Sequence, residues 1–90
     1  MPMSEDYQQR LFSRLPEIIK YFSTPFHILD EKGILKTGEC LKNTFRDIQG
    51  FQEYYAIKAL PTPAILKLMK QISFWLDCSS ASELILARQL

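Results

Sequence analysis

The chain has 90 residues, 47% of them hydrophobic and 23% charged, which is the composition of one small globular domain or of a piece of a larger one. Its formal net charge is +1, and no cluster of Lys and Arg suggests nucleic-acid binding. No apolar run approaches the ~20 residues of a membrane span, and the acidic N-terminus has no signal-sequence pattern. We therefore expect a cytoplasmic protein that binds neither nucleic acid nor membranes.

The first 23 residues predict a helical arm. Leu11, Leu15, Ile18 and Phe22 recur at helical spacing, and Pro16 is compatible with the first turn of a second short helix. Residues 24–30 (TPFHILD) follow as a short apolar run, with a proline in front and a turn cluster behind. This pattern is typical of a short strand near a sheet edge.

Helices and strands alternate after this first strand. We expect a helix at residues 34–48, a strand at 54–59, a helix from 62, a strand at 74–78 and a helix from 80. Thr62-Pro63 and the capping box Ser80-Ala81-Ser82-Glu83 mark the starts of the last two helices. Strands separated by helices predict a parallel sheet.

Two charged side chains are expected at the C-terminal ends of neighbouring strands. Alternation places Ala56 and Lys58 on one face of the first, and Asp77 ends the next. Barrel enzymes carry their chemistry at this end, and a lysine there can form a Schiff base with a carbonyl cofactor. A lysine at a strand end is also commonly a solvated surface residue, and Asp77 can simply pair with it.

Four segments of the chain form a recognisable series: 24–30 (TPFHILD), 55–59 (YAIKA), 63–68 (PAILKL) and 77–84 (DCSSASEL). In this order they resemble the fold-type III pyridoxal-phosphate-dependent decarboxylases, which include diaminopimelate and ornithine decarboxylases. The resemblance implies an α/β fold: the first βα units of a TIM-type (β/α)8 barrel, preceded by an N-terminal helix and a short strand. Residues 1–23 would be the arm and 24–90 the incomplete N-terminal part of the barrel. A full barrel has on the order of 250 residues, so we expect the 90 residues alone to be inactive.

The resemblance also implies a cofactor, pyridoxal 5'-phosphate. We expect no metal site, because the single histidine, His27, has no suitable partner ligands nearby in the sequence. Lys58 corresponds to the catalytic Schiff-base lysine, Ala56 to the small residue before it, and Asp77 and Glu83 to acidic residues of the cofactor site. Glu83 is equally explained by the capping box. The implied activity is decarboxylation of an amino acid, most like that of diaminopimelate decarboxylase. This would be a lyase of lysine or polyamine biosynthesis, with an amino acid as substrate and a homodimer as the full-length enzyme.

Several positions depart from the family pattern and leave alternatives open. Leu60 replaces the usual Asn, Ala81-Ser82 replaces a Gly-Gly pair, and Ile72-Ser73 replaces glycines. The alternatives are an ornithine- or lysine-type decarboxylase, an alanine-racemase-like enzyme, a non-catalytic regulator resembling the antizyme inhibitors, and a small helical interaction module. The identity of the substrate stays open.

Overall fold

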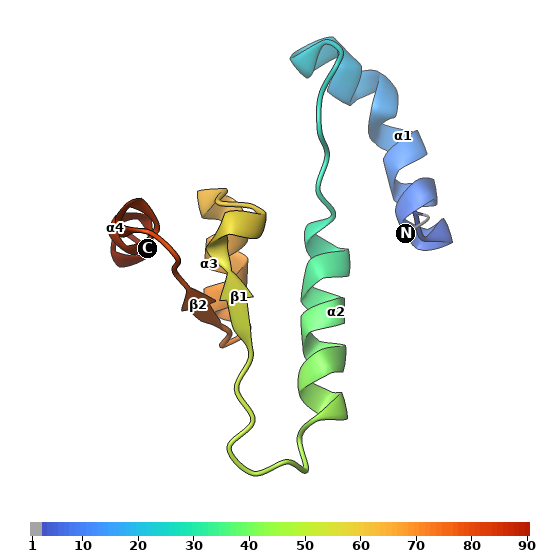
Figure 1. The fold of residues 1–90 in the computed structure, drawn as a ribbon. Coiled ribbons are helices and arrows are strands. Elements are labelled where there is room, and N and C mark those ends of the chain that lie inside the picture. Colours follow the sequence, from blue (N-terminus) through green and yellow to red (C-terminus); the bar gives the residue numbers. More distant parts are fainter. Residues whose placement is uncertain (1–2) are drawn as a thin grey trace. The chain divides into compact units, whose positions relative to one another are not determined.

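The computed structural model describes residues 3–90, which fall into two compact units, Met1–Gly33 and Ile34–Leu90. The elements in chain order are α1 (Glu5–Phe22), α2 (Glu31–Thr44), β1 (Tyr54–Ala56), a 3₁₀ turn (Ile57–Ala59), α3 (Pro63–Gln71), β2 (Trp75–Asp77) and α4 (Ala81–Arg88) (Figure 1). Helices hold most of the regular structure.

The first unit contains α1 and the segment that leads into α2. Ser4 caps α1, its side chain accepting a hydrogen bond from the backbone N–H of Tyr7 at 3.2 Å, and the helix continues through Pro16 without ending. One helix therefore replaces the two short helices that Pro16 allowed. None of the residues of α1 is buried.

An ion pair ties α1 to the residue just before α2. The Arg10 guanidinium donates to both carboxylate oxygens of Asp30, at 3.0 Å to Oδ1 and 2.9 Å to Oδ2. This hydrogen bonding holds the pKa of the Asp30 carboxyl below its ordinary value, and the backbone N–H of Gly33 adds to the shift. The same pairing with Asp30 raises the pKa of Arg10. Asp30 is thus held as a carboxylate between a helix side chain and the first turn of the next helix.

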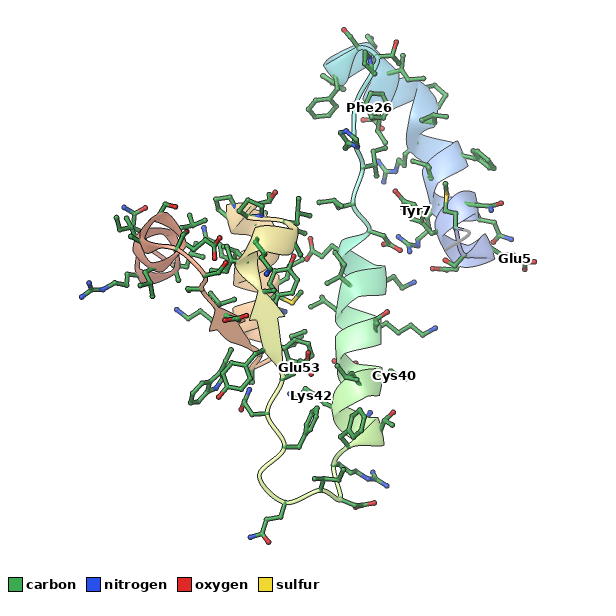
Figure 2. The ribbon with its side chains drawn as sticks, viewed as in Figure 1. Glu5, Tyr7, Phe26, Cys40, Lys42 and Glu53 are labelled. Atoms are coloured by element: carbon green, nitrogen blue, oxygen red, sulfur yellow. The ribbon has the colours of Figure 1, made fainter. Side chains whose placement is uncertain are left out.

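The second unit has a small core on one face of its sheet, to which α2 and α3 contribute. Ile65, Met69 and Ile72 form a buried cluster, against which Leu35, Phe74 and other apolar side chains of this unit pack. Gly38 is the one buried residue of α2, and a Cβ at that position would overlap Cδ1 of Ile72. Lys42, labelled in Figure 2, donates to the backbone carbonyl of Ile72 at 3.0 Å. The core of the unit therefore lies between α2, α3 and the sheet.

β1 and β2 pair in parallel, with Tyr54 opposite Trp75, Tyr55 opposite Leu76 and Ala56 opposite Asp77. Tyr55 and Leu76 pack on the buried cluster. By alternation Tyr54 and Trp75 lie on the other face, where their side chains stay 52% and 59% exposed. The core therefore covers one face of the sheet only.

The expected barrel portion is wrong. Within residues 3–90 the sheet has two strands of three residues. Residues 24–30 form no strand, because they make no ladder with another segment of the chain. β1 ends at Ala56, where the chain enters the 3₁₀ turn closed by the Leu60 N–H on the Ile57 carbonyl at 3.1 Å. A mostly helical chain with a two-stranded parallel sheet replaces the predicted succession of βα units.

Candidate functional site

The site predicted from the sequence centres on the end of the sheet where Lys58 and Asp77 occur. Lys58 is the middle residue of the 3₁₀ turn, two residues beyond the end of β1, and its side chain is exposed. The preceding residue, Ile57, is completely buried. A buried anchor thus fixes the backbone next to an accessible amine.

Asp77 is brought to the same end of the sheet by the strand register. It is the last residue of β2, it is exposed, and its Cα pairs with that of Ala56, which is half-buried. Lys58 and Asp77 form no ion pair with each other in the described part of the chain. The structure therefore places an exposed amine and an exposed carboxylate at the same end of the sheet, and no ion pair joins them in the described residues.

Glu83 makes the contacts that the capping box predicted. Its carboxylate accepts hydrogen bonds from the backbone N–H of Ser79 at 2.7 Å and from the Ser79 hydroxyl at 3.1 Å. The Ser80 hydroxyl in turn accepts from the Glu83 backbone N–H at 3.2 Å. The cap of α4 accounts for the local contacts of this carboxylate. Whether it also serves a cofactor stays a prediction.

A surface hollow follows α2, but its lining comes from this helix and the turn after it: Lys36, Glu39, Cys40, Asn43, Thr44 and Arg46. Cys40 is labelled in Figure 2, and its thiol is free. No group of three or more His, Cys, Asp or Glu side chains is placed to hold a metal ion in this part of the chain. None of its helices is both long and apolar enough to cross a bilayer.

Two features escaped the sequence reasoning. The Arg10–Asp30 pair joins residues 20 positions apart, and no local sequence pattern predicts it. Tyr54 and Trp75 form an exposed edge-to-face pair with ring centroids 5.5 Å apart. Strand alternation places both residues on one face of the sheet, but it does not show which face the core covers.

Comparison with known proteins gives one informative match. The chain is 48% identical along all of its 90 residues to Protein TabA of Pseudomonas amygdali pv. tabaci, and it spans 21% of that protein's length. No family model matches the chain, and no solved structure matches it.

These findings correct the family assignment. Membership in the fold-type III decarboxylases is wrong, because no family model supports it and the relative matched along the whole chain carries a name that denotes no decarboxylase. The decarboxylase activity and the role in lysine or polyamine biosynthesis that depended on it are wrong as well. The four resembling segments are short and consist of residue types that helix caps and apolar strands already require.

Proposed function

We propose that Lys58 is an attachment site for pyridoxal 5'-phosphate and that the chain is part of an enzyme that uses this cofactor. The observation that supports the proposal is the sheet register, which sets the Lys58 turn and Asp77 at one end of the two strands. The proposal concerns the cofactor and its lysine, and it assigns no reaction to the enzyme.

The residues at this end of the sheet fit an aldehyde. Attachment needs an accessible amine, and Lys58 is exposed beside the small residues Ala56 and Ala59. The amine nitrogen would add to the aldehyde carbon, and a C=N bond would form as the aldehyde oxygen leaves as water. Asp77 would offer a carboxylate to accept a hydrogen bond from the ligand.

An amino acid is the small-molecule partner that fits this proposal, since its primary amine competes with that of Lys58 for the same aldehyde. When bound, the cofactor supplies an electron-withdrawing ring that stabilises negative charge on an attached amino acid. Binding and orientation are the tasks left to the chain's own residues, Lys58 by its covalent bond and Asp77 by its charge. A homodimer of the full-length enzyme stays a prediction.

Borohydride trapping tests the proposal. The chain is mixed with pyridoxal 5'-phosphate, reduced with borohydride and analysed by intact mass and peptide mapping. We expect one reduced phosphopyridoxyl group per chain, on Lys58, and none in Lys58→Ala. Lys67→Ala is the matched control, because Lys67 is also an exposed lysine of the same unit. Label spread over several lysines, or label that persists in Lys58→Ala, would show adventitious reaction and refute the proposal.

The role of Asp77 is tested separately by the concentration of cofactor needed for half-maximal absorbance of the adduct. Asp77→Asn removes one negative charge and keeps the size of the side chain, so it should raise that concentration by about tenfold, as the loss of a charge-assisted hydrogen bond does. Asp47→Asn is the control, because Asp47 lies in the loop between α2 and β1 and is 97% exposed. Equal affinities of the two variants would remove Asp77 from the site.

A further inference from the structure

One face of the sheet is covered by the core and the other is open. We call Tyr54, Ala56, Trp75 and Asp77 the open sheet face, because the register and strand alternation put them opposite Tyr55 and Leu76. The two aromatic rings of this face contact each other at 71° and remain more than half exposed. They expose roughly 200 Å² of aromatic surface, given the area that such side chains bury in a core.

This arrangement is unusual for strands that run in parallel. Parallel sheets are almost always covered on both faces, whereas antiparallel sheets tolerate one wet face. A sheet of two three-residue strands is also too small to be stable without layers packed on it. The same unit carries a second uncovered apolar surface on α4, which has no buried residue and exposes Leu84 and Ile85 by 54% and 58%.

We propose that the open sheet face is a docking surface for polypeptide, and that its occupant is an apolar segment from the part of a TabA-type protein outside the matched region. The chain aligns with TabA along its whole length but spans 21% of it, so roughly four-fifths of the relative is polypeptide with no counterpart in these 90 residues. That length supplies an occupant, and the exposed Tyr54–Trp75 pair supplies an anchor of the kind that dominates polypeptide interfaces. The inference does not depend on the cofactor proposed above.

The test uses the full 90-residue chain and the rest of TabA as two polypeptides that are produced separately and then mixed, with an affinity tag on the TabA part. Trp75 is the only tryptophan of the chain, so 5-fluorotryptophan incorporated into the chain before mixing gives one ¹⁹F signal. We expect the chain to co-purify with the TabA part. The ¹⁹F chemical shift of Trp75 should no longer change when H₂O is replaced by D₂O, because the ring is then removed from water.

Variants locate the contact. Trp75→Ser and Tyr54→Ser should each weaken the complex at least tenfold, because truncation of a central aromatic anchor has effects of this size. Tyr21→Ser is the control, since Tyr21 of α1 is 74% exposed and outside the open sheet face. Circular dichroism checks that each variant keeps its helices, and the ¹⁹F readout on the unsubstituted chain decides the question if a variant unfolds.

Three results would overturn the inference. One is a folded chain that forms no complex with the TabA part, and a second is a complex in which the Trp75 signal stays water-sensitive. The third is a homodimer, seen by sedimentation without the TabA part and disrupted by Trp75→Ser. That outcome would make a second copy of this chain the occupant.

Discussion

Asp30 is a partly buried carboxylate, with 19% of its side chain exposed. Arg10 contacts both of its oxygens, and such forked pairs are stronger than single charged hydrogen bonds. Because the pairing lowers the pKa of Asp30, the unfolded chain takes up a proton at a higher pH than the folded chain does. The stabilisation is therefore fully present above the ordinary pKa of 3.8 and is lost as the pH falls through the lowered folded value.

This gives a prediction for acid unfolding of the first unit. The helical circular dichroism signal of the unsubstituted chain should have a higher thermal midpoint than that of Asp30→Asn. We expect the difference between the two midpoints to be constant above about pH 5 and to shrink below pH 4. Glu5→Gln is the control, because Glu5 is an exposed carboxylate at the start of α1. A difference between the unsubstituted chain and Asp30→Asn that stays constant down to pH 2 would mean that the Arg10 contact adds no stability.

Local chemistry at single residues could be predicted from the sequence where partners are close in the chain. The cap of α4 is an example, since Ser80 and Glu83 lie three positions apart and their hydrogen bonds form within one helical turn. The Arg10–Asp30 pair could not be predicted from the sequence, because the two residues, 20 positions apart, come together only when the segment that joins them folds. The sequence predicted correctly that Lys58 and Asp77 follow neighbouring strands. It placed Lys58 within the strand, whereas in the structure Lys58 lies in the 3₁₀ turn after β1.

At the scale of elements, helices were easier to predict than strands. The periodic segments became α1, α2, α3 and α4 near their expected places, because a helix makes its hydrogen bonds within its own segment. A strand needs a partner, and the sequence does not show pairing. Residues 24–30 have the apolar content of a strand but remain unpaired, and Asp30 at their end binds Arg10 instead.

The contact of α2 with the core depends on a missing side chain. Gly38 faces Ile72, and a Leu at position 38 would have to displace this buried residue. We expect Gly38→Leu to lower the free energy of unfolding by about 1–3 kcal/mol, as overpacking of a core usually does, although leucine favours helix more than glycine does. Urea denaturation followed by Trp75 fluorescence measures the change.

Thr37→Leu is the matched control for this variant. Thr37 is the neighbouring residue of α2 and is exposed, so the same side chain is introduced one position away from the core. It should change stability by no more than about 0.5 kcal/mol. Equal effects of the two variants would show that α2 does not pack through Gly38.

At the scale of the whole molecule, the sequence predicted the content of elements better than their assembly. The order of strands and helices suggested a parallel sheet, and β1 and β2 do pair in parallel. The sequence did not predict the number of strands or the family correctly, because short apolar and capping segments occur in many unrelated folds. The open sheet face is a property of the assembly, and no single segment of the sequence signals it.

The division into two units gives the last prediction. Every member of the buried cluster and every side chain packed on it lies between Ile34 and Leu76, so a chain of residues 30–90 keeps the complete core and all of α2. We expect its free energy of unfolding, from urea denaturation followed by Trp75 fluorescence, to stay within about 0.5 kcal/mol of the full chain, as for changes away from a core.

The matched comparison is residues 45–90, which lack α2 and with it Leu35 and Gly38. This shorter chain should lose its cooperative transition, because the cluster is then uncovered on one side. If residues 30–90 also unfold without a transition, α1 is required for the fold of the second unit.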